Sequence, residues 1–324
     1  MKPFDAASAI GRLHGIHAAT VCPLGPDYSI DERALAEHVT QVAQTPGIEG
    51  LLINGHAGEN FLLSRDEKKR VVAIVREAVG AGVFLTSGVN TEPSLEAATH
   101  ARDAQEAGAD AILLFPPNSW ALSHEEEAVM AHHRHVVEAC DLPLLLYQAP
   151  VGAGAMAYPV RSLEQLVKLP RVIGIKEGSW EVSAYEENRR AVKALRPDLA
   201  VLGSGDEHLL ASYLIGSEGS QVSLAAVVPE AVVSLWQASE RGDWTEARRW
   251  HDALYPLAVA VYRQAPASRA TARLKACLHI LGQIPSAAMR PPAQPCGIEE
   301  YRELERAMAG LRPPTIAEAR GSVA

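Results

Sequence analysis

The sequence predicts an α/β fold, a TIM (β/α)8 barrel with a C-terminal helical extension. Short apolar runs of strand length alternate with longer segments of helical periodicity, and several runs are apolar at every position, as buried parallel strands are. A doubly wound open sheet would need a glycine-rich phosphate loop after its first strand, and none is present. The eight predicted strands are residues 15–22, 50–54, 83–88, 111–115, 143–147, 172–176, 200–203 and 221–223.

The segments between these runs carry helix signals. Leu35, Val39 and Val42 follow the helical spacing that places apolar side chains on one face. A serine stands three residues ahead of a glutamate at positions 29, 64 and 123, which predicts a capping box at the start of three helices. These helices are expected to form the outer ring of the barrel.

The strand pattern ends near residue 229. Four further helices are predicted, at residues 231–241, 244–263, 268–282 and 298–311, and no strand pattern follows. We therefore expect a catalytic barrel at 1–228, a helical extension packed on it at 229–312, and a tail at 313–324.

Composition and charge restrict the partners. The 324 residues carry a formal net charge of −9 without a basic cluster, which argues against nucleic acid. No run approaches the ~18 apolar residues of a membrane span, and the first residues lack a signal-peptide pattern, so no membrane partner and a cytoplasmic location are expected. The four cysteines are scattered, which predicts reduced thiols and no metal site.

A lysine closes the sixth predicted strand. Lys176 follows the run Val-Ile-Gly-Ile, and the carboxyl ends of barrel strands line the active site. Burial there would lower its pKa and free the amine as a nucleophile for a ketone. The alternative is a structural ion pair, with the adjacent Glu177 as its partner.

Two further features accompany this lysine. Tyr147 ends the adjacent fifth strand, where its phenol would shuttle protons, although a core tyrosine is the simpler interpretation. The second strand is followed by Gly55-His-Ala-Gly-Glu59, a turn whose backbone amides can bind a carboxylate. Alone, this turn is also compatible with a tight connection in which Glu59 makes a structural hydrogen bond.

Together these features resemble the dihydrodipicolinate synthase / N-acetylneuraminate lyase family. The resemblance covers residue 15 to about residue 292 and includes Tyr147-Gln-Ala-Pro150, Gly174-Ile-Lys-Glu-Gly-Ser179, Gly203-Ser-Gly-Asp-Glu207, Leu274-Lys and Arg290-Pro-Pro292. It implies a TIM barrel, usually a homotetramer, that needs no metal or organic cofactor. It also implies a Schiff base between Lys176 and pyruvate or a pyruvate-derived 2-oxo acid, proton transfer by Tyr147, and carboxylate binding by the turn of Gly55, His56, Ala57, Gly58 and Glu59.

The chain also departs from the family pattern. His56 and Ala57 replace the usual Thr or Ser; His56, with an unperturbed pKa near ~6.5, is a candidate acid/base or a hydrogen-bonding group for the carboxylate. The loop at 115–120 lacks the family's tyrosine and the loop at 150–155 lacks its arginine. Both losses argue against dihydrodipicolinate synthase activity, which stays open as an alternative.

The distal part of the substrate is assigned to other residues. Asp206, Glu207 and Ser223 stand where sugar-acid aldolases bind hydroxyls, which favours a polyhydroxylated or otherwise polar 2-oxo acid, and Ser204 is a further substrate-binding candidate. A bulkier, less charged second substrate is also compatible, with Trp120 as a stacking partner or else as a subunit contact. The predicted function is a class I aldolase-type lyase; the alternatives are a dehydratase or hydratase-aldolase of a deoxy-oxo sugar acid, and a non-catalytic keto-acid-binding protein.

Overall fold

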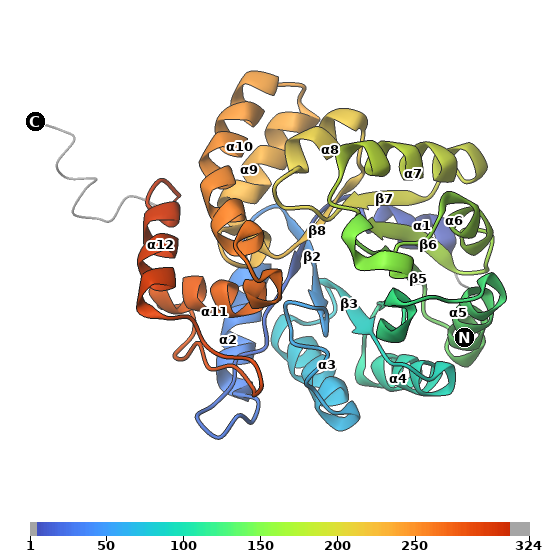
Figure 1. Ribbon diagram of the computed structural model, residues 1–324, viewed down its shortest axis with the longest axis horizontal. Helices are drawn as coiled ribbons and strands as arrows, with labels where there is room; N and C mark the ends of the chain where they lie inside the picture. The colour runs from blue at the N-terminus through green and yellow to red at the C-terminus, as the bar shows by residue number, and fades with distance from the viewer. Residues whose placement is uncertain (1–4, 312–324) are drawn as a thin grey trace, which may run out of the picture.

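The computed structural model describes residues 5–311, and its centre is a closed barrel of eight parallel strands in sequence order (Figure 1). All eight predicted strands are present, with bounds that differ by a few residues. The eighth begins two residues earlier than predicted and leaves Ser223 outside the strand. The strands are β1 Gly15–Ala19, β2 Ile48–Ile53, β3 Phe84–Val89, β4 Ala111–Leu114, β5 Leu144–Gln148, β6 Val172–Glu177, β7 Ala200–Gly203 and β8 Gly219–Val222.

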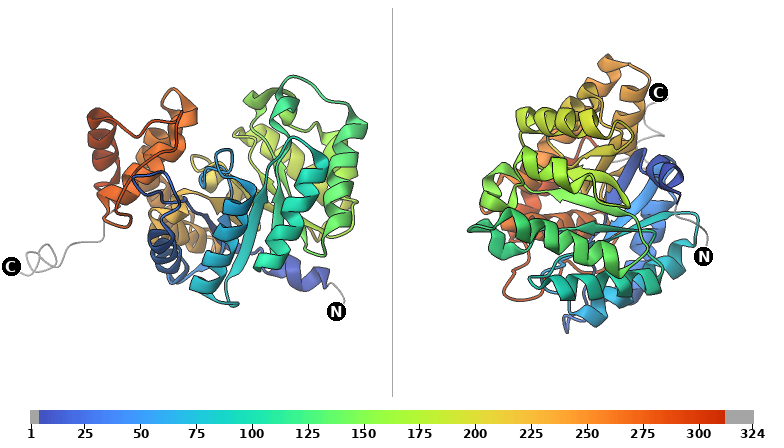
Figure 2. Two further views of the ribbon diagram at one scale, coloured as in Figure 1. Left: turned by 90° about the horizontal axis from the view of Figure 1, so that it is seen from below. Right: turned by 90° about the vertical axis from the view of Figure 1, so that its right-hand side faces the viewer.

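A ring of helices surrounds the strands, one after each strand. The ring consists of α2 Glu32–Ala43, α3 Arg65–Val79, α4 Ser94–Ala107, α5 Glu126–Ala139, α6 Val160–Leu166, α7 Val182–Leu195, α8 Leu209–Ile215 and α9 Pro229–Glu240. The short helix α1 Ala6–Gly11 lies at the N-terminal end of the barrel, where Ala9 and Ile10 pack against its interior (Figure 2). No helix in the described part of the chain has the length and apolar composition needed to cross a bilayer.

One of the three predicted capping boxes is confirmed. Ser64 and Glu67 cap the start of α3 reciprocally. The predictions at Ser29 and Ser123 are wrong, because α2 begins after Asp31, whose carboxylate caps it, and α5 begins after Glu125. Ser29 instead donates its hydroxyl to Asp27 within a turn, which shows that a serine before a glutamate can equally serve a local turn.

The C-terminal extension lies at one side of the barrel (Figure 1) and comprises α10 Trp244–Ala258, α11 Ala270–Ile280 and α12 Ile298–Met308. The helix predicted for 244–263 contains Pro256 and continues from Val259 to Arg263 as a π-helix. α9 packs on β1 and α8, in the eighth position of the outer ring. We therefore propose that the barrel includes α9 and that the extension begins with α10. The tail predicted for 313–324 lies outside the described residues.

The apolar strands bury both of their faces, as predicted from their composition. In β5, Leu144 and Leu146 face the helices, whereas Leu145 and Tyr147 face the barrel interior. The same alternation places Ile175 outward and Lys176 inward beside Tyr147, its partner in the register of β5 and β6. Strand alternation thus decides which side chains reach the mouth of the barrel.

Closure of the barrel between β1 and β8 depends on a glycine. Gly219 has φ 151°, and a Cβ atom there would lie 2.1 Å from the carbonyl oxygen of Gly15. We expect Gly219→Ala to destabilise the protein by on the order of 3 kcal/mol, because backbone at the seam would have to move. Chemical denaturation measures this, and Gly11→Ala, where no atom lies within 4 Å, is the control. Equal midpoints for the two variants would contradict this explanation.

Candidate active site

Lys176 and Tyr147 extend from adjacent strands into the mouth of the barrel. Lys176 is partly buried, and burial lowers its pKa to about 8, while the charge of Asp206 opposes the shift. Among the described residues, no carboxylate lies within 4.0 Å of its ammonium group. Glu177, the alternative partner, faces the outer layer and accepts hydrogen bonds from Asn188 (2.9 Å) and the Ser179 hydroxyl (3.0 Å). The ion pair with Glu177 is therefore not formed.

Tyr147 is almost fully buried. Its ring centroid lies 4.6 Å from that of Phe115, and burial raises the pKa of its phenol, which is therefore neutral near pH 7. Gly178, just after β6, passes so close that a Cβ atom there would lie 2.8 Å from the Gln148 carbonyl oxygen and 3.4 Å from the Tyr147 ring. A side chain at this position would clash with the backbone of Gln148, the residue that follows Tyr147.

The turn after β2 presents two free amides. The N–H groups of Gly58 and Glu59 donate within the turn, to the carbonyl oxygens of Gly55 and His56 at 3.0 and 3.1 Å. Within residues 5–311, the amides of His56 and Ala57 have no acceptor. Glu59 has φ 56°, a left-handed conformation that strains a residue with a side chain by about 1–3 kcal/mol. Such free, adjacent amides can bind an anion.

His56 lies in an aromatic stack above this turn. Its ring centroid is 4.5 Å from that of Phe115 and 4.8 Å from that of Phe61, and it meets Tyr147 edge-on at 5.4 Å. Burial, followed by the charge of Lys176, lowers its pKa to about 3. The argument from an unperturbed pKa near ~6.5 therefore does not hold, and His56 is a neutral imidazole that can exchange hydrogen bonds.

The C-terminal extension holds the turn from outside the barrel. Lys275 on α11 is fully buried and forms an ion pair with the buried Glu59. Its ammonium group also donates to the Ala288 carbonyl oxygen at 2.9 Å, and the Thr271 hydroxyl donates to the His56 carbonyl oxygen at 3.2 Å. A buried carboxylate needs such a partner, so α11 fixes the strained end of the turn.

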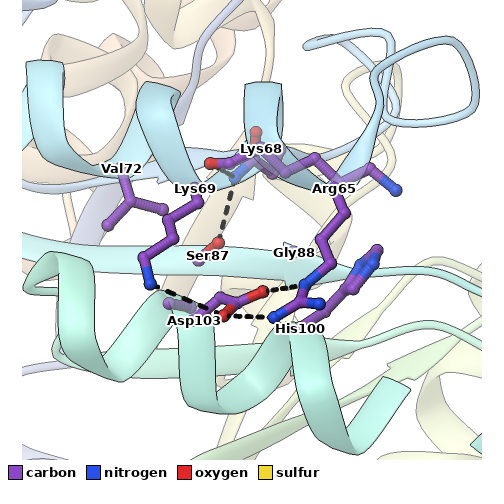
Figure 3. Close-up of a pocket in the computed structure, with 10 residues that line it drawn as sticks. Arg65, Lys68, Lys69, Val72, Ser87, Gly88, His100 and Asp103 are labelled. Atoms are coloured by element: carbon purple, nitrogen blue, oxygen red, sulfur yellow. Dashed lines mark hydrogen bonds and ion pairs between the residues drawn. The ribbon is translucent and has the colours of Figure 1, made fainter. Parts of the chain in front are cut away.

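On its other side, the turn is connected to polar residues that surround a small cavity between α3 and α4 (Figure 3). Its volume of about 10 Å³ is comparable to that of one water molecule. The Asn54 amide, at the start of the turn, donates to the Lys68 carbonyl oxygen and the Ser87 hydroxyl. Arg65 and Lys69 both reach Asp103 across the cavity. These hydrogen bonds and ion pairs connect α3, α4 and the turn, and the cavity between them is too small for a substrate.

Of the predicted distal residues, Asp206 lies near enough to act on Lys176 through its charge. Burial raises the pKa of Asp206 to about 6, and its carboxylate accepts the Leu224 amide at 2.9 Å. Ser204 is buried beside Gly178, whereas Ser223 is partly exposed next to Tyr262. Glu207 is buried and forms an ion pair with the half-exposed Arg263. Asp206 is therefore the carboxylate whose charge acts on Lys176.

A cavity of about 550 Å³ opens beside Tyr147 and His56. Sequence reasoning missed three of its aromatic residues: Phe61, Trp180 on the loop after β6, and Tyr262 in the π-helix. No periodic signal marks any of them, although Trp180 follows the Lys176 segment closely. Trp120, the predicted stacking residue, packs on His124, His132 and Tyr158 and is not among the described residues that line the cavity. No group of three or more potential metal ligands occurs within residues 5–311.

Comparisons with known proteins agree with this architecture. The model of the dihydrodipicolinate synthetase family matches residues 12–310. An uncharacterized DapA-like lyase of Thermococcus kodakarensis is 30% identical over 91% of this chain and 98% of its own length. The 4-hydroxy-tetrahydrodipicolinate synthase of Desulfotalea psychrophila is 28% identical over 93% and 97%. The crystal structure of dihydrodipicolinate synthase from Agrobacterium tumefaciens superposes with a TM-score of 0.82 at 25% identity, covering 95% of this chain and all of that one.

Removal of the buried counter-charge tests the support of the turn. We expect Lys275→Met to destabilise the protein by about 3–5 kcal/mol, because Glu59 keeps a buried charge without a partner. The double variant with Glu59→Gln should recover part of this loss. Chemical denaturation provides the measurement, and Arg302→Met, which removes an ion pair exposed on both sides, should cost far less. Similar losses for Lys275→Met and Arg302→Met would contradict the role given to the buried pair.

Proposed function

Because the chain belongs to the dihydrodipicolinate synthetase family, we propose that it is a class I aldolase-type lyase in which Lys176 forms a Schiff base with pyruvate or a pyruvate-derived 2-oxo acid. The observation that carries this proposal is an unpaired, inward-facing lysine of lowered pKa beside a buried phenol. With a pKa near 8, about one-tenth of the amine is neutral at pH 7, against about one in 3,000 for an ordinary lysine.

The substrate is oriented by the turn after β2. Its carboxylate accepts hydrogen bonds from the His56 and Ala57 amides, and the neutral His56 ring adds a further hydrogen-bonding group. We propose that the ketone carbon then faces the Lys176 amine, whose charge acts on the His56 ring. The turn supplies the carboxylate site without the hydroxyls usual in the family, because its binding groups are main-chain amides.

Proton transfer and charge stabilisation fall to two further groups. The neutral Tyr147 phenol donates a proton to the oxygen that leaves the carbinolamine as water, and later moves the proton of the C4 hydroxyl during C–C bond cleavage or formation. The iminium that results is positively charged. Asp206, ionised near pH 7 and close enough to affect the Lys176 pKa, stabilises that charge.

Other reactions of the same imine are a dehydration or a hydratase-aldolase reaction. An assay for released pyruvate separates them, since a dehydratase releases none. A dihydrodipicolinate synthase is disfavoured, because the loops that form the short helices at Asn118–Ala121 and Val151–Met156 contain neither tyrosine nor arginine. A non-catalytic keto-acid-binding protein would form the imine without turnover, and the homotetramer stays a prediction.

Reductive trapping tests the Schiff base directly. With pyruvate and cyanoborohydride, we expect a covalent adduct on Lys176 and none in Lys176→Ala, because the reductant fixes the imine carbon to the amine nitrogen. Peptide mass spectrometry locates the adduct, and Lys168→Ala is the control on a lysine outside the site. An unmodified Lys176, or an adduct confined to other lysines, would exclude the proposed chemistry.

The pH dependence of trapping tests the electrostatic argument. The neutral amine is the nucleophile, so the rate of imine formation at low pyruvate should rise with pH through a midpoint near 8. Asp206 raises the Lys176 pKa, so Asp206→Asn should move the midpoint to lower pH. Trapping rates between pH 6 and 9.5 measure both midpoints. A midpoint in the range of ordinary lysine, or one that Asp206→Asn moves upward, would refute the assignment.

A further inference from the structure

The cavity beside the reacting centre extends well beyond the space needed by a three-carbon acid. His56 and Tyr147 form its inner end, next to Lys176, and Ala270, Met289 and Pro292 of the extension form its outer wall. Its volume of about 550 Å³ falls within the range of roughly 300–1,000 Å³ that is usual for small-molecule sites. A second substrate of considerable size fits between the barrel and the extension.

The wall of this cavity offers no cation to a second anionic group. Among the described lining residues, Glu59 is the one with a formal charge, and the buried Lys275 neutralises it. Arg263 is paired with Glu207. A carboxylate or phosphate on the distal part of a substrate would lose its hydration without gaining a partner, which is unfavourable.

The cavity wall also offers few hydrogen-bonding partners to hydroxyl groups of a substrate. Ser204, Asp206 and Ser223, the residues predicted to bind a polar substrate, are not among the described residues that line this cavity. Of the serine and threonine hydroxyls among the described lining residues, that of Thr271 already donates to the His56 carbonyl oxygen, and the exposed Ser268 offers one further group. A polyhydroxylated chain would therefore leave most of its hydrogen bonds unmade.

Aromatic side chains occur on two parts of the wall. Phe61 is 52% exposed although its ring lies 4.8 Å from His56. Trp180 and Tyr262 form a second pair, with centroids 5.0 Å apart. Exposed aromatic faces inside an apolar cavity favour a flat ligand, since ring pairs gain energy beyond that of burial alone.

We propose that the second substrate of this site is an uncharged aldehyde with a flat apolar body, of the benzaldehyde class; this rests on the proposed function. Tyr147, left as the phenolate when the carbinolamine loses water, takes the C3 proton of the pyruvate iminium. The enamine that results attacks the aldehyde carbon, and one C–C bond forms. The aldehyde oxygen takes a proton from Tyr147, and hydrolysis of the iminium returns Lys176. Pyruvate and aldehyde thus combine into one 4-hydroxy-2-oxo acid without an oxidant or reductant, and cleavage is the reverse.

A panel of three aldehydes tests the class of substrate. Purified protein with pyruvate is given benzaldehyde, 4-carboxybenzaldehyde, which adds a charge to the same ring, or glyceraldehyde, and product formation is followed by chromatography with Lys176→Ala as the blank. We expect kcat/KM for benzaldehyde to exceed both others at least about tenfold. Trp180→Ala should reduce this preference, Trp180→Phe should keep most of it, and the exposed Trp244→Ala should leave it unchanged.

Each outcome decides the matter. Preference for benzaldehyde that depends on Trp180 supports the proposal. The proposal is overturned if 4-carboxybenzaldehyde or glyceraldehyde is turned over as well as benzaldehyde or better, or if no aldehyde is turned over. If the pyruvate imine is still trapped on Lys176 in these cases, the Schiff-base function stands. Absence of the imine overturns both, so the trapping experiment separates the two failures.

Discussion

The candidate active site depends on one electrostatic condition: the Lys176 amine is shielded from water without a carboxylate in contact with it. Contact with Glu177 would stabilise the protonated amine and raise its pKa again. Glu177 instead faces the outer layer, where Asn188 and Ser179 donate hydrogen bonds to it. Asp206 lies near enough to act on the amine through its charge, yet no carboxylate of the described chain is within 4.0 Å. After the register shift near the start of β6, the alternation from Ile175 to Glu177 thus separates the proposed nucleophile from a structural carboxylate.

The turn after β2, the proposed carboxylate site, depends on parts of the chain that are distant in sequence. Its free amides exist because Gly58 and Glu59 close the turn on themselves, and the left-handed Glu59 is held by Lys275 of the extension. The extension also forms the outer wall of the apolar cavity. The extension that supplies the counter-charge of the turn therefore also bounds the cavity beside Tyr147 and His56, which links the two parts of the candidate site physically.

The sequence predicted the parts of the fold that follow a periodic apolar pattern and missed those that do not. Buried parallel strands are apolar on both faces, so the barrel, Lys176 and Tyr147 were all placed correctly. The start of β8 was predicted two residues late because its first residues, Gly219 and Ser220, are not apolar. Trp180, at φ 61° on an irregular loop, and Tyr262, in a π turn, obey no period. The lowered pKa of His56 depends on an aromatic stack that only the tertiary structure assembles.

The ion pair between Glu59 and Lys275 also has a consequence for the order of events during synthesis. A ribosome makes the first member of the pair more than 200 residues before the second. During that interval the emerging barrel carries an acidic, strained turn whose counter-charge does not yet exist, so the turn stays open to water. The turn after β2 therefore reaches its final structure among the last parts of the molecule. A polypeptide that ends before α11 has every strand of the barrel but lacks the counter-charge of Glu59.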